Sequence, residues 1–202
     1  MISKWPIYST KEINKVLKVI KSNKVNYWTG EEGKKFELEF SRYFKLRYSV
    51  AIANASLGLE CALKALNIKK GDQVIVPSKS YVSSASCVVN VNAKPVFCDI
   101  DLNSQNITPE EIEKLITKKT KAIICVHLGG FPCDMPKISR LCKRKKIKII
   151  EDCSQAHGAK IGKNFVGSFG DIAVWSFCND KIISTLGEGG MISTNNQNLF
   201  NK

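Results

Sequence analysis

The sequence predicts an α/β fold with a mixed, mostly parallel sheet and helices on both faces. Short apolar stretches of strand length alternate with amphipathic stretches of helix length, which is typical of parallel sheets whose crossovers are helices. This alternation stops in the last third of the chain, where residues 171–177 and 190–194 both have strand character without a helical pattern between them. An antiparallel return after the parallel part is therefore expected.

Two helices are expected before the first strand of the sheet. Residues 9–22 and 31–44 both place apolar side chains at helical spacing. The loop that joins them carries Trp28, Thr29 and Gly30.

Strands and helices then alternate along the chain. The predicted strands cover residues 49–53, 73–76, 95–98, 121–126 and 147–150, and the predicted helices between them cover residues 57–66, 82–91, 109–116 and 135–143. The sequence ends directly after a strand, without a closing helix, which predicts an interrupted domain.

Composition is that of an ordinary globular protein. Of 202 residues, 44% are hydrophobic and 24% are charged, close to globular averages. No apolar run approaches the roughly 18–20 residues of a membrane helix, and residues 1–6 lack the apolar core of a signal peptide. A cytoplasmic protein without a membrane partner is expected.

The formal net charge of +13 comes mainly from lysine. Such a charge could favour binding to nucleic acid, to an anionic surface or to an anionic small substrate. The lysines are spread along the chain, and the densest group, residues 143–146, falls at a predicted helix end, where cations suit the helix dipole. No specific nucleic-acid partner is therefore expected.

The eight cysteines include no C-x-x-C pair. Their spacing indicates neither a zinc site nor a disulfide framework. Most of them lie in apolar stretches, so we expect reduced, buried thiols and predict no metal site.

Polar side chains follow the ends of the predicted strands. Asp152 comes just after the apolar strand 147–150, at the edge where open α/β sheets bind ligands. A helix N-cap or a metal ligand would explain an aspartate there as well. Tyr81 begins a helix after another strand, where its ring could lie on a planar cofactor or pack in the ordinary way.

Residues 54–58 join the first strand of the sheet to a helix. The free N–H groups of such a helix start can hold a phosphate, although Ser56 by itself is more simply explained as the N-cap. Neither residues 158–163 nor residues 187–190 complete a P-loop or a dinucleotide-binding fingerprint. The sequence therefore indicates a phosphate site without the usual nucleotide-binding motifs.

Lys181 completes a set of groups that suits pyridoxal phosphate (PLP). It follows the strand that contains Ser176 and lies within thirty residues of Asp152. An amine can form an imine with the cofactor, a carboxylate can keep its ring nitrogen protonated, and hydroxyl and N–H groups can bind its phosphate. The combination is more specific than any one member.

Motifs along nearly the whole chain match one known family. They are Tyr27-Trp28-Thr29-Gly30, Ala53-Asn54-Ala55-Ser56, residues 71–78, 95–99 and 151–158, Ser176-Phe177 with Lys181, and Gly187-Glu188-Gly189-Gly190. In these motifs the sequence resembles the DegT/DnrJ/EryC1/StrS family of PLP-dependent sugar aminotransferases, which have the aspartate aminotransferase (type I) fold.

The resemblance implies a three-layer α/β/α PLP-transferase large domain that is truncated, with the small C-terminal domain missing. Residues 1–30 would form an N-terminal helix and an active-site loop, and residues 31–202 most of the PLP-binding large domain. Family members continue well beyond residues 187–190. The chain is therefore expected to be a fragment of a longer protein, and by itself it could be inactive.

The resemblance also implies roles for individual residues. Lys181 would be the catalytic residue that binds PLP and moves the reacting proton, and Asp152 would pair with the ring nitrogen. The remaining assignments are phosphate binding by Ala55, Ser56 and Ser176, stacking by Tyr81, a hydrogen bond from Gln155 to the phenolic oxygen, and substrate binding by Trp28, Thr29 and Gly30.

The activity implied is amino transfer, usually from glutamate, to a keto group of a nucleotide-linked deoxysugar, for surface polysaccharide or secondary metabolites. A homodimer is expected, because the second subunit completes the site in relatives. Sugar dehydratases of the family carry His in place of Lys181, so a dehydratase or lyase is the less favoured alternative. A truncated, inactive fold that acts only as a basic binding protein is the other.

Overall fold

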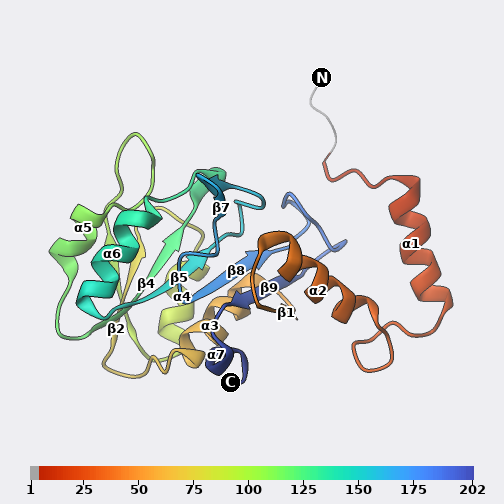
Figure 1. The fold of residues 1–202 in the computed structure, drawn as a ribbon, viewed down its shortest axis with the longest axis horizontal. Coiled ribbons are helices and arrows are strands. Elements are labelled where there is room, and N and C mark those ends of the chain that lie inside the picture. The colour runs from red at the N-terminus through yellow and green to blue at the C-terminus, as the bar shows by residue number, and fades with distance from the viewer. Residues whose placement is uncertain (1–4) are drawn as a thin grey trace.

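A central seven-stranded sheet organises the chain, for which the computed structural model describes residues 5–202 (Figure 1). The strand order is β1-β9-β8-β5-β4-β2-β3, and β9 runs antiparallel to both of its neighbours. The predicted mixed, mostly parallel sheet is thus confirmed. Its strands are β1 (Tyr48–Ile52), β2 (Gln73–Pro77), β3 (Lys94–Cys98), β4 (Thr120–Val126), β5 (Lys148–Asp152), β8 (Ile172–Ser176) and β9 (Gly190–Thr194).

Six helices appear where the sequence predicts them. Each predicted helix and each predicted strand of the sheet matches the structure to within two residues at either end. The helices are α1 (Thr10–Lys21), α2 (Glu32–Phe44), α3 (Ala55–Ala65), α4 (Ser83–Asn90), α5 (Pro109–Leu115) and α6 (Met135–Lys145).

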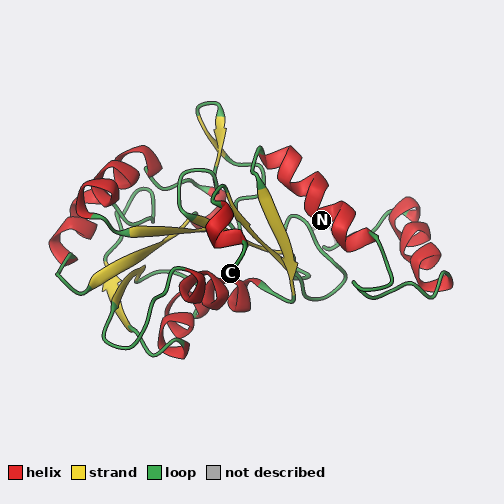
Figure 2. Cartoon of the chain, turned by 60° about the horizontal axis from the view of Figure 1, so that its bottom comes forward, coloured by secondary structure: helices red, strands yellow, loops and turns green. Residues whose placement is uncertain are grey.

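Helices cover both faces of the sheet, so the fold is a three-layer α/β/α arrangement (Figure 2). Successive side chains of a strand point to opposite faces, and β2 shows the division. Val74 and Val76 belong to the core with α3 and α4, whereas Ile75 belongs to the core with α5 and α6. On the second face, α2 packs Phe40 against Trp175 of β8, with ring centroids 5.0 Å apart.

Parallel pairing brings several strand ends to one edge of the sheet. Asp152, the last residue of β5, lies between Val126 of β4 and Val174 of β8 in the strand register. This edge is where ligands bind in open α/β sheets.

Two features near the end of the chain differ from expectation. The two-residue strands β6 (Lys160–Ile161) and β7 (Asn164–Phe165) form a small hairpin that is too short for its pattern to show in the sequence. The expected absence of a closing helix is wrong, because α7 (Gln197–Phe200) follows β9. Asn196 caps this single turn, and Phe200 stacks on Tyr48 at 4.5 Å.

Helix α1 stands apart from the sheet (Figure 1). Ser9 and Glu12 form a capping box at its start, and none of its residues is buried. Of the predicted N-terminal unit of residues 1–30, residues 1–4 lie outside the described part of the chain.

The cysteines are free, and six of the eight are buried, as expected. Burial raises the pKa of the Cys98 and Cys142 thiols to about 12, so they remain protonated at neutral pH. Over residues 5–202, no helix combines the length and the apolar character needed to cross a bilayer.

Candidate active site

A cavity of about 640 Å³ lies at the carboxyl edge of the sheet. The end of β5, the end of β8, the start of α3 and the loop between β8 and β9 all contribute to its wall. The structure thus gathers side chains from segments far apart in the sequence. All seven residues assigned to the cofactor line this cavity: Ala55, Ser56, Tyr81, Asp152, Gln155, Ser176 and Lys181.

The Asp152 carboxyl group is almost fully buried, with 7% of the residue exposed. One oxygen accepts a hydrogen bond from the Ser154 N–H at 3.0 Å. Residues 153–159 form turns, so the alternative role as a helix N-cap is wrong. Burial raises the pKa of Asp152, against the lowering effect of the Ser154 hydrogen bond. A cationic ligand nitrogen beside this carboxyl group would favour its charged form.

The start of α3 presents unpaired N–H groups to the cavity. Asn54, not Ser56, is the N-cap, because its Oδ1 accepts a hydrogen bond from the Leu57 N–H at 3.0 Å. Within the described residues the N–H groups of Ala55 and Ser56 have no acceptor. Together with the helix dipole, such groups form an anion site.

Two further features shape this anion site. A Cβ at Gly190 would lie only 3.0 Å from the Ala55 nitrogen, so the glycine allows β9 to approach the start of α3 closely. The Ser176 Oγ accepts a hydrogen bond from the Cys178 N–H at 3.2 Å. Its hydroxyl proton is thus available to another acceptor.

Lys181 lies on the loop between β8 and β9, and its side chain is 22% exposed. Its Nζ pairs with an Asp180 carboxylate oxygen at 3.0 Å. The Cys178 thiol donates a hydrogen bond to Glu188 at 3.2 Å, and both residues also line the cavity. Neither Cys178 nor Glu188 is predicted as a site residue from the sequence, because their pairing across the loop has no local pattern.

Gln155 and Tyr81 occupy the cavity wall differently. The Gln155 Oε1 accepts a hydrogen bond from the Gly129 N–H at 2.6 Å. Its amide N–H groups therefore remain to donate to an oxygen in the cavity. Tyr81 is 70% exposed at the rim, where one ring face can cover a planar ligand.

Trp28, Thr29 and Gly30 do not line this cavity. Trp28 is 88% exposed, and the Asn26 Oδ1 accepts hydrogen bonds from the N–H groups of Trp28 and Thr29. A Cβ at Gly30 would come within 2.5 Å of the Lys24 carbonyl oxygen, so the turn requires glycine. The assignment of these residues to substrate binding stays a prediction.

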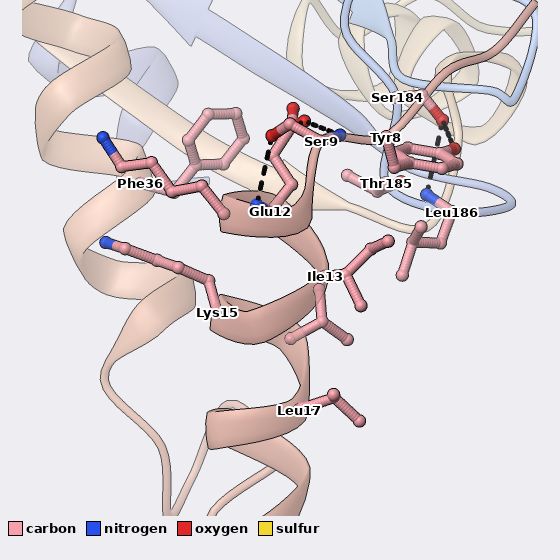
Figure 3. A pocket seen from close by; sticks show the side chains of 12 residues that line it. Tyr8, Ser9, Glu12, Ile13, Lys15, Leu17, Phe36, Ser184, Thr185 and Leu186 are labelled. Carbon is pink, nitrogen blue, oxygen red and sulfur yellow. Dashed lines mark hydrogen bonds between the residues drawn. The ribbon is translucent and has the colours of Figure 1, made fainter.

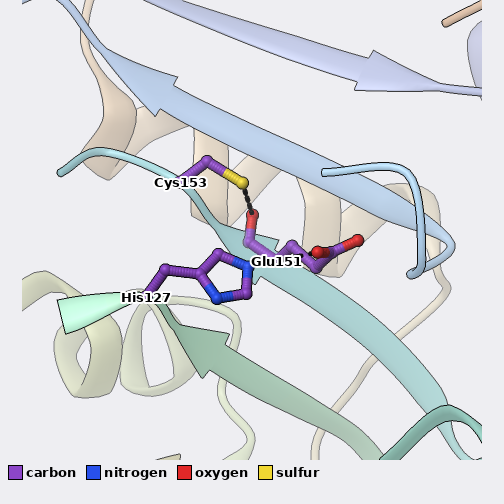
Figure 4. Close-up of side chains that lie close together, drawn as sticks. All are labelled: His127, Glu151 and Cys153. Atoms are coloured by element: carbon purple, nitrogen blue, oxygen red, sulfur yellow. Dashed lines mark hydrogen bonds and ion pairs between the residues drawn. The ribbon is translucent and has the colours of Figure 1, made fainter. Parts of the chain in front are cut away.

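A buried cluster next to Asp152 combines His127, Glu151 and Cys153 (Figure 4), whose potential ligand atoms lie within 4.8 Å of one another. The His127 Nδ1 accepts a hydrogen bond from the Cys133 N–H at 3.1 Å, so its Nε2 carries the ring proton and donates to Glu151 at 3.1 Å. Cys153 directs its thiol toward the Glu151 carbonyl oxygen. Both imidazole nitrogens are therefore already engaged in hydrogen bonds.

The Glu151 carboxylate is fully occupied as well. One oxygen accepts from the N–H groups of Phe169 and Gly170 at 2.7 and 2.6 Å. The other accepts from Gly167 at 2.8 Å and from His127. These bonds attach residues 167–170 to β5, and we interpret the cluster as a structural network that fixes the strand carrying Asp152.

Replacing Glu151 with glutamine is expected to lower the free energy of unfolding by about 2–5 kcal/mol, because the new amide NH₂ group faces two buried donors. Urea unfolding followed by circular dichroism measures this. Glu39→Gln, at an exposed position, is the matched control. A Glu151→Gln protein within about 0.5 kcal/mol of the unmodified protein would contradict the prediction.

The three-layer α/β/α fold and the cavity at the edge of its sheet define the large domain of a PLP-dependent transferase. A buried carboxyl group, an amine and a helix-start anion site surround one space, as the cofactor requires. The chain belongs to the DegT/DnrJ/EryC1/StrS aminotransferase family, whose model matches residues 6–202.

Relatives and solved structures agree with this family. GDP-perosamine synthase of Escherichia coli O157:H7 is 38% identical over 200 residues, which cover 98% of this chain and 55% of that protein. An aminotransferase from Psychrobacter cryohalolentis is 48% identical with a TM-score of 0.97, covering 99% of this chain and 51% of that one. NtdA of Bacillus subtilis, with bound cofactor PMP, is 30% identical with a TM-score of 0.88, covering 98% and 47%. The chain spans about half the length of these proteins.

Proposed function

We propose that the protein transfers an amino group from glutamate to a keto group of a nucleotide-linked deoxysugar, with PLP as cofactor. The observation that carries the proposal is the convergence of Lys181, Asp152 and the start of α3 on one cavity. A relative named GDP-perosamine synthase supports an activated sugar as the substrate class. The amino sugar would serve a surface polysaccharide or a secondary metabolite.

The polar groups of the cavity fit PLP. The N–H groups of Ala55 and Ser56 and the Ser176 hydroxyl would hold its phosphate. The Gln155 amide would donate to its phenolic oxygen, and Tyr81 would cover one ring face. When bound, the cofactor supplies an electron sink for the carbon that carries the amino group.

Each central side chain then has a distinct task. The Asp152 carboxylate would hold a proton on the ring nitrogen, because the cation relieves the cost of burying the anion. Lys181 would anchor the cofactor through its amine and carry a proton to and from the reacting carbon. Asp180, paired with Lys181 at 3.0 Å, would orient that amine.

We place this activity in a homodimer in the cytoplasm. Leu57 and Val82, next in sequence to the cavity-lining residues Ser56 and Tyr81, are 49% and 68% exposed, and a second subunit would cover them. The eight free cysteines suit a reducing compartment.

The proposal is tested by supplying purified protein with PLP, glutamate and nucleoside-diphosphate keto deoxysugars. Mass spectrometry of the sugar and an assay for 2-oxoglutarate should show nitrogen gained by the sugar and lost by glutamate in equal amounts. A sugar that loses a hydroxyl group without gaining nitrogen would instead indicate a dehydratase. Salt-dependent retention on nucleic acid without uptake of PLP would instead support a basic binding protein.

A further inference from the structure

The loop that carries Lys181, residues 178–188, has few attachments to the rest of the molecule. At its ends, the Phe177 N–H donates to the Gly189 carbonyl at 2.8 Å and the Thr185 N–H donates to the Phe177 carbonyl at 3.1 Å. Among residues 5–202, Tyr8 is the one residue outside the β8–β9 segment that hydrogen-bonds to this loop. The Lys181 loop therefore depends on Tyr8 for its external anchoring.

The Tyr8 hydroxyl contacts the loop on both sides of Lys181, and Figure 3 shows the contact with Ser184. It lies 2.9 Å from the Ser184 Oγ and 3.4 Å from the Asn179 Oδ1. A phenol has one proton to donate, so Tyr8 donates to Asn179 and accepts from Ser184. Ser184 in turn accepts from the Leu186 N–H at 3.3 Å. One chain of hydrogen bonds thus connects both flanks of Lys181 to Tyr8.

Packing on this side of the loop is loose, which raises the importance of the hydrogen bonds. A cavity of about 1030 Å³ lies between α1 and the loop, lined by Ile13 and Leu17 on one side and by Thr185 and Leu186 on the other (Figure 3). Tyr8 lines the same cavity. Where a cavity replaces contact, dispersion forces contribute little, so the phenol is the principal link across this gap.

We propose that Tyr8 is a positioning residue that holds the Lys181 loop in the geometry needed for the lysine to reach the cofactor. This inference rests on the proposed role of Lys181. A reacting amine has to be held to within about 0.5 Å, and loops with few contacts open easily. Fixing Asn179 and Ser184 together restricts the backbone on both sides of Lys181.

Tyr8→Phe removes the hydroxyl and keeps the ring. We expect the loop amides of the cofactor-free protein to exchange hydrogen about threefold to tenfold faster. This factor corresponds to the free energy of the one to two hydrogen bonds that are lost. The rate of covalent PLP attachment to Lys181, measured by borohydride trapping and mass spectrometry, should fall by a similar factor. Tyr27→Phe is the matched control, because its hydroxyl donates to Glu37 at 3.1 Å and does not touch the loop.

Ser184→Ala removes the bond between Tyr8 and Ser184 but leaves the bond between Tyr8 and Asn179, so it should give part of the effect of Tyr8→Phe. The double variant should add little to Tyr8→Phe, because Tyr8→Phe already removes the shared bond. Unchanged loop exchange in Tyr8→Phe overturns the inference, and so does faster exchange with unchanged attachment. Equal effects of Tyr27→Phe would also overturn it. Failure of the unmodified protein to attach PLP at Lys181 is a separate result that refutes the proposed function.

Discussion

Lys181→Ala is expected to abolish covalent binding of PLP and to stop amino transfer. Lys181 is the one lysine on the wall of the 640 Å³ cavity, so among the described residues no second amine can replace it there. Loss of proton transfer alone should slow the reaction with glutamate by about 10²- to 10⁴-fold. Single-turnover absorbance and the mass of the borohydride-reduced protein measure the two effects.

Lys163→Ala is the control for this variant, because Lys163 is exposed and does not line the cavity. Its PLP attachment and turnover should match those of the unmodified protein. Amino transfer by the Lys181→Ala protein at an undiminished rate would refute the catalytic assignment.

Asp152→Asn is expected to have opposite effects on activity and on stability. An amide cannot stabilise a cationic ring nitrogen as a carboxylate does, and a nearby opposite charge shifts a pKa by about 1–3 units. The protonated fraction of the cofactor, and with it the turnover rate, should fall by about 10- to 10³-fold. The pH dependence of the bound-cofactor absorbance reports this change directly.

The stability of the cofactor-free protein should change in the other direction. Burial raises the pKa of Asp152 above its ordinary value of 3.8, so the folded protein binds this proton more tightly than the unfolded chain does. This contribution to stability is complete below pH 3.8 and is lost as the pH rises through the raised pKa. The asparagine side chain has no carboxyl group to ionise, so the Asp152→Asn protein keeps this stability and should unfold at a higher urea concentration at neutral pH.

Urea unfolding at several pH values tests this prediction, with exposed Asp99→Asn as the control. In the unmodified protein and in Asp99→Asn, ionisation of Asp152 should lower the stability as the pH rises. In Asp152→Asn this decrease should be absent. A lower midpoint for Asp152→Asn at neutral pH would show that the carboxylate stabilises the cofactor-free protein.

Local patterns were sufficient to predict most of the fold. Strands of the sheet are buried on both faces and therefore appear in the sequence as short apolar runs, as β2 does, and helix boundaries follow from apolar spacing and caps such as Ser9 with Glu12. The same patterns placed Asp152 at the end of a strand and Lys181 in a loop after one. The single turn α7 was missed because a helix of four residues has no periodicity.

The sequence by itself determined the order of the elements, the edge of the sheet that carries the site and the residue types gathered there, because these depend on neighbours in the chain. Tertiary structure alone decided the Glu151 network, the contact of Tyr8 with Ser184 across 176 positions and the separation of Trp28 from the cavity. Hydrogen bonds between distant segments leave no periodic signal, since their geometry is set only when the sheet and its loops have assembled.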